Sequence, residues 1–332
     1  MRPHPSWALH LFTLAVVLTA CAVRPPLQQV PAEPPVAVAP PTPAPQATTV
    51  TGLPLPTQVA PFVQAVTGQR STPVPVAAPD PRMPALAAEI DSLLQERTGE
   101  YGVTIEWVPT HQRTSHDGGR AFESASVYKI AVAYEVLHQV DRGQVALADH
   151  LSVTDDDASE VEPEGGLAPD DEVSVWEALE AMMGVSSNSA AHALMRLVGR
   201  AEINASLHAL GLKATHIPED DDQGPALTSA SDVANLLDLV ADNRVLSPES
   251  RQNLRTLLAL PEDIDPLIEC LPTGTEVLSK TGNQDRASNV AGLVSTPRGP
   301  LIISVFDEDV DPGDARATIE AITRAAWDAY AE

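Results

Sequence analysis

Three lysines, Lys129, Lys213 and Lys280, are the only ones in a chain that otherwise uses arginine as its basic residue. An arginine stays charged, whereas a lysine amine can lose its proton when its surroundings are apolar or cationic. Lys129 follows Ser126 by three residues, a spacing that places both side chains on one face of a helix. A serine hydroxyl becomes a good nucleophile when a neighbouring base takes its proton. The pair therefore predicts an activated serine.

A simpler interpretation of the pair is a helix-capping Ser126 followed by an ordinary surface lysine. Two further motifs bear on this choice. Residues 186–188, Ser-Ser-Asn, open a predicted helix, and residues 280–282, Lys-Thr-Gly, end a predicted strand. In the last motif the lysine supplies charge, the threonine a hydroxyl, and the glycine lets a ligand approach the backbone closely. Taken singly, these motifs also fit a helix cap and a strand running into a turn.

Together and in this order, the three motifs resemble the signature of the penicillin-recognising serine hydrolases, Ser-x-x-Lys with Ser-Asp-Asn and Lys-Thr-Gly. Within that superfamily the chain looks most like the class A β-lactamases, from about residue 84 to the end. The likeness extends beyond the motifs themselves, over Ala121–Gln139, Met182–Gly199 and Thr228–Leu237.

The resemblance implies a role for each residue of the first two motifs. Ser126 would attack the substrate carbonyl and become acylated. Lys129 would accept the proton, directly or through a relay, and Ser186 would pass a proton to the departing nitrogen. Asn188 would hold the substrate amide and help to fix Lys129.

The third motif would bind the substrate. Lys280 and Thr281, followed by Gly282, would receive the substrate carboxylate, and Lys280 would also support the proton relay. The backbone N–H groups of Ser126 and Asn283 would form the oxyanion hole. No cofactor and no metal ion is expected, and Lys213 is expected to be an ordinary surface residue.

Two departures from the family pattern concern binding and local structure. Ser187 stands where the family usually has aspartate, a largely structural side chain. Asn289 stands where class A enzymes often have an arginine that helps to bind the carboxylate, and Arg286 is the nearby residue that would compensate.

A third departure concerns release of the acyl group. Class A enzymes carry Glu-x-x-Leu-Asn on the Ω-loop, where the glutamate activates water. The corresponding stretch here, residues 215–225, contains acids but lacks that pattern. Glu219 is a candidate base, but an unanchored acidic run is more typical of solvated loop residues. Without a positioned base, acylation would proceed while deacylation stalls.

The hydrophobic pattern predicts an α+β fold, with an antiparallel sheet flanked by helices and a separate helical region. A first helix ends before Gly99, and a strand covers 103–107. Residues 109–120 are expected to be a hairpin loop that turns at Asp117-Gly118-Gly119. A helix starts at Ser126 and runs to about Val140. The remaining elements are helices near 175–183, 189–198, 203–210, 231–241, 248–260 and 315–330, and strands at 277–282, 290–295 and 301–306.

The first and last helices are expected to cover one face of the sheet, and the helices from the middle of the chain the other, leaving a cleft between sheet and helices. The continuous apolar run 301–306 predicts a central strand.

Charge excludes one class of partner. The formal net charge is −26, whereas binding to nucleic acid needs a basic surface. The resemblance implies that the acidic stretch Asp155–Glu172 borders the cleft, where its clustered carboxylates would repel anionic β-lactams.

The N-terminal region predicts export. Residues 1–20 have a short apolar run that ends in Leu-Thr-Ala-Cys, which resembles the lipobox of bacterial lipoproteins. An ordinary secretory signal with an incidental cysteine is the alternative. Lipidation at Cys21 would anchor the protein in a membrane, facing the periplasm or the cell exterior. It would also leave Cys270 without a disulfide partner.

Residues 21–83 are proline-rich and predict a disordered tether. The catalytic domain is expected at 84–332.

Three functions remain open. A β-lactamase-type hydrolase of β-lactams is favoured. A D,D-peptidase or penicillin-binding protein would direct the same chemistry at peptidoglycan peptides. A non-catalytic lipoprotein that binds cell wall is the third, against which Ser126, Lys129 and Lys280 argue.

Overall fold

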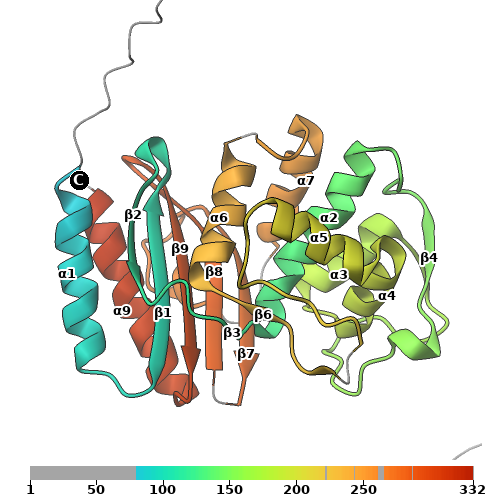
Figure 1. The fold of residues 1–332 in the computed structure, drawn as a ribbon, viewed down its shortest axis with the longest axis horizontal. Helices are drawn as coiled ribbons and strands as arrows, with labels where there is room; N and C mark the ends of the chain where they lie inside the picture. Colours follow the sequence, from blue (N-terminus) through green and yellow to red (C-terminus); the bar gives the residue numbers. More distant parts are fainter. Residues whose placement is uncertain (1–79, 221–222, 243, 261–264, 286, 332) are drawn as a thin grey trace, which may run out of the picture. The chain divides into compact units, whose positions relative to one another are not determined.

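A five-stranded antiparallel sheet forms the centre of the described fold (Figure 1). The computed structural model describes residues 80–220, 223–242, 244–260, 265–285 and 287–331. The strand order is β2-β1-β9-β8-β7, so the first strands of the domain pair with the last. The strands are β1 (Glu100–Trp107), β2 (Gln112–His116), β7 (Val277–Gln284), β8 (Ala287–Thr296) and β9 (Gly299–Glu308).

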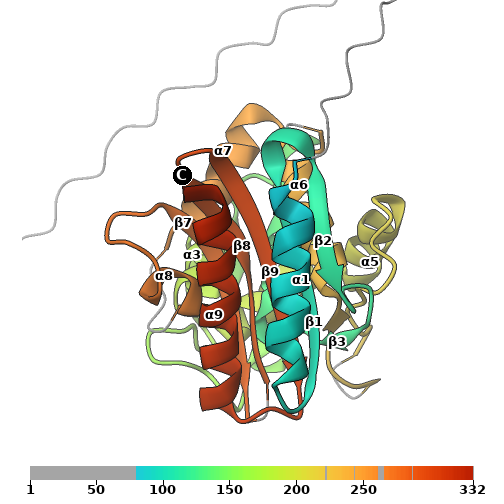
Figure 2. The ribbon, with the colours of Figure 1, turned by 90° about the vertical axis from the view of Figure 1, so that its left-hand side faces the viewer.

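The first and last helices, α1 (Arg82–Gln95) and α9 (Pro312–Ala331), lie side by side over one face of this sheet (Figure 2). Leu86 and Ile90 of α1 and Ile319 and Ile322 of α9 are buried in one apolar cluster with the sheet. The spacing of these residues matches the helical period, which explains why each helix turns one face to the strands. The short helix α8 (Pro266–Glu269) also contacts α9.

The opposite face of the sheet is covered by α6 (Ala230–Ala241), which contacts β1, β8 and β9. Beyond it lies the helical region (Figure 1). Its central helix is α2 (Lys129–Asp141), of which residues 129–137 are all buried. The helices around α2 are α3 (Val175–Gly184), α4 (Asn188–Val198), α5 (Arg200–Ala209) and α7 (Pro248–Leu258).

Short elements connect these layers. Two small antiparallel ribbons pair β3 with β6 and β4 with β5. They are β3 (Phe122–Glu123), β4 (His150–Ser152), β5 (Glu172–Ser174) and β6 (Leu227–Thr228). Three 3₁₀ turns complete the described elements: η1 (Val108–Thr110), η2 (Ala125–Tyr128) and η3 (Asp155–Asp157).

The predicted fold class and layers are confirmed, including a central position for the strand that contains 301–306. The predicted hairpin loop 109–120 is wrong in part. A first turn lies at 108–111, where His111 has φ 56°, and residues 112–116 form the edge strand β2. The turn predicted at Asp117-Gly118-Gly119 is present, because the N–H of Arg120 donates to the carbonyl of Asp117 at 2.9 Å. The helix predicted to start at Ser126 is also corrected, because a 3₁₀ turn holds Ser126 and α2 begins at Lys129.

The predicted signal peptide, Cys21 and nearly all of the predicted tether lie outside the described residues. Within the part of the chain that the structure describes, the helices are too short or too polar for any of them to cross a membrane.

Candidate active site

Ser126 lies in η2, immediately before α2. In a 3₁₀ turn, residues three apart lie above one another, so Ser126 and Lys129 share one side. The preceding residue, Ala125, has φ 43°, a left-handed conformation that costs a non-glycine residue about 1–3 kcal/mol and is typical of functional sites. The N–H of Ser124 donates to the carbonyl of Ala226 at 2.9 Å, which ties the serine segment to the β6 region.

Lys129 and Ser186 form a polar chain that ends at Ser126. The fully buried Lys129 donates through Nζ to the carbonyl oxygen of Ser186 at 2.5 Å and to its hydroxyl at 3.1 Å. The Ser186 hydroxyl in turn donates to Ser126 Oγ at 2.8 Å. A single hydroxyl therefore links the lysine amine to the candidate nucleophile.

The second motif reaches this chain because the backbone turns sharply before α4. Ser186 has φ 60°, and Ser187 begins the helix by accepting from the N–H of Ala190 at 3.1 Å. Asn188 points its Oδ1 at Lys129 Nζ, 2.8 Å away, and donates through Nδ2 to the carbonyl of Val161 at 2.5 Å. Lys129 is thus held by two of the three polar side chains of the motif, Ser186 and Asn188.

The third motif lies in β7, directly against residues 124–126, the segment that carries Ser126. Lys280 and Thr281 are buried, and Lys280 Nζ donates to the carbonyl of Thr281 at 3.0 Å. A Cβ on Gly282 would lie 2.8 Å from the backbone nitrogen of Ser126 and 2.9 Å from the carbonyl oxygen of Ser124. The glycine therefore makes room for the chain's own backbone, whereas the sequence interpretation assigned that room to a ligand.

A cavity of about 330 Å³ opens at the candidate nucleophile. Three of the predicted site residues line it: Ser126, Asn188 and Asn283. Lys129 and Ser186 are bonded behind them, so the structure brings together the residues predicted from the first two motifs. The remaining lining residues are Ser124, Ala125, Tyr128, Val161, Pro225, Ala226 and Gln284.

The acidic loop does not supply this cavity with a base in the part of the chain that is described. Glu219 is exposed and is absent from the lining, to which the same loop contributes Pro225 and Ala226. None of the described lining residues carries a carboxylate. The neighbouring acids Asp221 and Asp222 lie outside the described residues.

One residue that the sequence interpretation missed contacts the second motif. The carboxylate of Glu162 accepts from the backbone N–H groups of Asn188 at 3.0 Å and Ser189 at 2.9 Å. Glu162 lies 26 residues before Asn188 in an acidic loop, so no local pattern marks it.

A second cavity, of about 640 Å³, adjoins the first and shares Val161, Asn283 and Gln284 with it. Five acids line it, namely Glu123, Asp285, Asp307, Glu308 and Asp309. Burial raises the pKa of the Asp307 carboxyl to about 7, against the opposing effect of a hydrogen bond from the N–H of Ser288.

Asn289 is part of the sheet in this region. It is 1% exposed, accepts from the N–H of Asp307 at 3.1 Å and donates to the carbonyl of Glu123 at 2.8 Å. Asn289 therefore joins β3 to β9. Arg286, the predicted compensating cation, lies outside the described residues.

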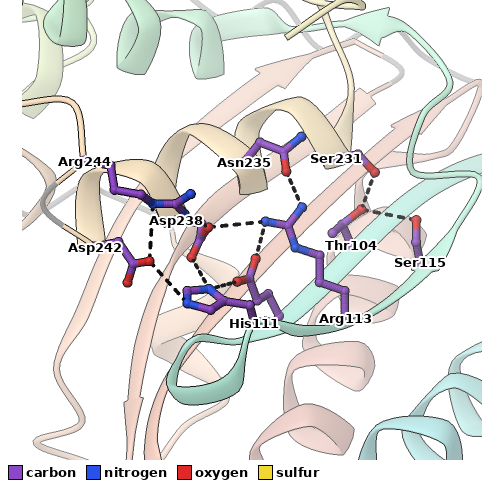
Figure 3. A network of polar contacts seen from close by, with 10 residues as sticks. Thr104, His111, Arg113, Ser115, Ser231, Asn235, Asp238, Asp242 and Arg244 are labelled. Atoms are coloured by element: carbon purple, nitrogen blue, oxygen red, sulfur yellow. Dashed lines mark hydrogen bonds and ion pairs between the residues drawn. The ribbon is translucent and has the colours of Figure 1, made fainter. Parts of the chain in front are cut away.

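A polar network that joins β1 and the turn after η1 to α6 contains three possible metal ligands, Glu106, His111 and Asp238. His111 and Asp238 are labelled in Figure 3. His111 Nδ1 lies 3.0 Å from Glu106 Oε1 and 2.9 Å from Asp238 Oδ1, which are hydrogen-bond distances. Both carboxylates already form ion pairs with arginines at 2.5 Å, Glu106 with Arg113 and Asp238 with Arg244. The buried Oε2 of Glu106 is close to Arg113 but accepts no hydrogen bond. With arginines on both acids, the network is better explained as an ion-pair cluster than as a metal centre.

The pKa values in this cluster follow from its contacts. Burial, together with the nearby Asp238, raises the pKa of Glu106 against the pull of Arg113. Partial burial lowers the pKa of His111, but its hydrogen bonds with Glu106 and Asp238 outweigh that effect, so the net pKa lies above the ordinary value.

The fold and the three assembled motifs define a serine hydrolase of the penicillin-recognising class. Residues 85–330 match the model of the beta-lactamase enzyme family, and the chain belongs to that family.

Named relatives agree with this membership. The chain is 27% identical to the extended-spectrum beta-lactamase PER-1 of Pseudomonas aeruginosa, over 74% of the chain and 87% of that relative. An ancestral class A beta-lactamase superposes with a TM-score of 0.68 at 25% identity, covering 74% of the chain and 100% of that structure. A mutant of PBP-A in an acyl-enzyme complex with penicillin-G superposes with a TM-score of 0.69 at 25% identity, covering 74% and 96%.

Proposed function

We propose that the protein is a serine hydrolase that opens β-lactam rings through an acyl-enzyme on Ser126. The observation that carries the proposal is the contact chain from Lys129 through Ser186 to Ser126 beside an open cavity. Membership in the beta-lactamase enzyme family and the penicillin complex of PBP-A point to the same chemistry.

In the acylation step, Lys129 in its neutral form takes the proton of Ser126, directly or through the Ser186 hydroxyl. Ser126 Oγ then attacks the lactam carbonyl carbon. Backbone N–H groups of Ser126 and Asn283 stabilise the oxyanion that develops. As the carbon–nitrogen bond breaks, Ser186 donates a proton to the nitrogen and regains one from Lys129.

Binding of the substrate would use Asn188, which lines the same cavity, and two buried residues of β7. Asn188 holds the amide beside the ring, while Lys280 and Thr281 receive the carboxylate. A compact ammonium at position 280 suits this task, because it supplies charge without the bulk of a guanidinium fork.

One observation favours a second function. No described residue places a carboxylate at the cavity, and a general base is what the second, hydrolytic step needs. An acyl-enzyme that persists would make the protein a penicillin-binding protein or D,D-peptidase acting on peptidoglycan peptides, with weak lactamase activity.

A mass measurement with a turnover assay separates these functions. The purified protein is mixed with a chromogenic cephalosporin, hydrolysis is followed, and the intact mass is recorded over time. Turnover over many cycles is the expected result for a β-lactamase. A one-to-one adduct that persists indicates the penicillin-binding protein, and no adduct on either the wild type or Ser126→Ala contradicts both.

We also propose that the protein is exported and anchored in a membrane by a lipid on Cys21, for which the apolar run before that cysteine is the support. The expected result is that Cys21→Ser moves the protein from the membrane fraction to the soluble fraction. Equal membrane association of both forms would contradict the anchor.

A further inference from the structure

Glu162 brings a carboxylate to the N-terminal end of α4 from the loop between η3 and β5. Oε2 accepts from the N–H groups of Asn188 (3.0 Å) and Ser189 (2.9 Å) and from the hydroxyl of Ser189 (3.0 Å). Oε1 accepts from the hydroxyl of Ser187. The first N–H groups of a helix have no partner within the helix, and a negative charge is stabilising there. Glu162 thus caps the helix that carries the second motif.

The same loop fixes the side chain of Asn188. The carbonyl of Val161 accepts from Asn188 Nδ2, and Asn188 Oδ1 accepts from Lys129 Nζ. Turning this amide over would place its N–H groups against the lysine amine and its oxygen against a carbonyl, so both contacts would be lost. Residues 161–162 therefore hold Asn188, by its backbone and by its side chain, in the orientation that contacts Lys129.

Ser187 and Glu162 together stabilise the start of α4, Ser187 by accepting hydrogen bonds and Glu162 by supplying a negative charge. Ser187 is fully buried, and its hydroxyl accepts from the N–H groups of Ala190 (3.1 Å) and Leu167 (3.2 Å). A serine can accept these bonds but carries no charge. The charge comes from Glu162, which is 25 residues earlier in the chain.

Gly166 leaves the space that Glu162 occupies. A Cβ built on Gly166 would overlap Oε1 of Glu162 and lie 2.7 Å from its Cδ. The loop that holds Gly166 therefore has room for the Glu162 carboxylate only because residue 166 has no side chain. This steric fit supports the position of Glu162 independently of its hydrogen bonds.

We propose that Glu162 is a positioning residue for acylation, and that its carboxylate replaces that of an aspartate at position 187. Glu162 acts through the start of α4, because it bonds to Ser187, Asn188 and Ser189 there. Asn188 in turn contacts Lys129, and Glu162 does not itself line the cavity at Ser126. This inference rests on the proposed acyl-enzyme chemistry.

The test moves the carboxylate from position 162 to position 187 in the full-length protein. Glu162→Gln is expected to slow the acylation rate constant for a chromogenic cephalosporin about 10- to 100-fold, because small displacements of catalytic groups have effects of this size. The dissociation constant of the substrate should change far less. Ser187→Asp alone is expected to be harmful, since two carboxylates would then face each other.

The double variant Glu162→Gln/Ser187→Asp is expected to recover most of the rate, because a single carboxylate is present again. Glu164→Gln, which removes an exposed acid from the same loop, is the matched control and should behave as the wild type. Equal acylation by Glu162→Gln and the wild type, or additive losses in the double variant, would overturn the proposal. So would a lower melting temperature in Glu162→Gln with an unchanged rate at low temperature.

Failure of the proposed function has a different signature. In that case the wild type itself forms no adduct. The melting temperatures then still test whether a carboxylate at position 187 replaces that of Glu162. Glu162→Gln and Ser187→Asp should each lower the melting temperature, and the double variant should raise it again. Two additive decreases would refute this replacement without any reference to activity.

Discussion

The hydroxyl oxygens of Ser126 and Ser186 lie 2.8 Å apart, although 60 residues separate them in the chain. Behind them, the buried Nζ of Lys129 lies 3.1 Å from Ser186 Oγ. A proton can therefore leave the nucleophile and later reach the departing nitrogen through groups that are already in contact. This arrangement needs an amine that can exist without its extra proton.

Lys129→Arg tests that requirement. A guanidinium keeps the charge but does not release its proton in proteins. We expect the acylation rate constant to fall by about 10²- to 10⁴-fold, the range attributed to a positioned acid–base group. Stopped-flow measurement with a chromogenic cephalosporin gives this constant. The matched control is Lys213→Arg, at an exposed position, which should acylate as the wild type does. A fully active Lys129→Arg protein would exclude lysine as the base.

Gly282→Ala tests the close packing of β7 against the serine segment. The added Cβ would meet Ser126 N at 2.8 Å and Ser124 O at 2.9 Å, and both are backbone atoms that cannot rotate away. Overpacking of this kind costs about 1–3 kcal/mol. We expect a lower free energy of unfolding in urea together with slower acylation, because displacement of Ser126 N also disturbs the proposed oxyanion hole.

The control for this substitution is Gly119→Ala, because a Cβ at Gly119 would meet nothing within 4 Å. It should leave both stability and acylation unchanged. Wild-type values for Gly282→Ala would show that the two backbones can separate without loss.

The residues that were predictable from the sequence are those whose motifs are local. Ser126 and Lys129 are three residues apart at a helix start, a spacing that places both on one side. Ser186 and Asn188 are also close in sequence, but they reach Lys129 because the backbone turns at Ser186, which has φ 60°. The main helices and the sheet followed from their apolar periods. The structure then showed how the motifs meet, and it corrected the reason for Gly282.

The elements that were missed lack such a local signal. Strand β2 has intermediate and exposed residues in alternation and no buried one, so no apolar period marks it, as is usual for an edge strand. Gly118 does lie in the predicted turn, but its close packing had no signal in the sequence: a Cβ there would overlap the side chains of Ser115 and Thr104. Glu162 acts on residues 25 to 27 positions away, and only the folded chain shows that contact.

The ion-pair cluster between η1 and α6 predicts a pH dependence of stability (Figure 3). The pKa of His111 is raised in the folded state by Glu106 and Asp238, in excess of the lowering by partial burial. Such a group contributes stability that is complete below its unfolded pKa, about 6.5, and is lost as the pH rises through the folded value. We therefore expect the melting temperature to fall as the pH rises above about 6.5.

His111→Gln should reduce this slope, because the titrating group is gone. Glu106, whose pKa is raised by burial, also contributes stability that is lost as the pH rises, beginning at its own lower unfolded pKa. His208→Gln, on the exposed end of α5, is the control and should retain the wild-type slope. A variant at position 111 with an undiminished slope would remove His111 as the cause.

The five acids around the second cavity predict a salt dependence of acylation by anionic β-lactams. Their field opposes the approach of a negative substrate to the adjoining cavity at Ser126, and added salt screens it, with a Debye length of about 8 Å at 0.15 M. We expect the second-order rate constant for a substrate with one net negative charge to rise about two- to tenfold between low and physiological salt. A zwitterionic β-lactam should respond less, and Asp285→Asn should weaken the response to the anionic one.

Burial raises the pKa of the Asp307 carboxyl to about 7, so this group loses its charge at lower pH. The salt dependence should therefore also be smaller at pH 6 than at pH 8. A rate constant that falls with salt would mean that attraction to the cationic groups of the site outweighs the acidic cavity.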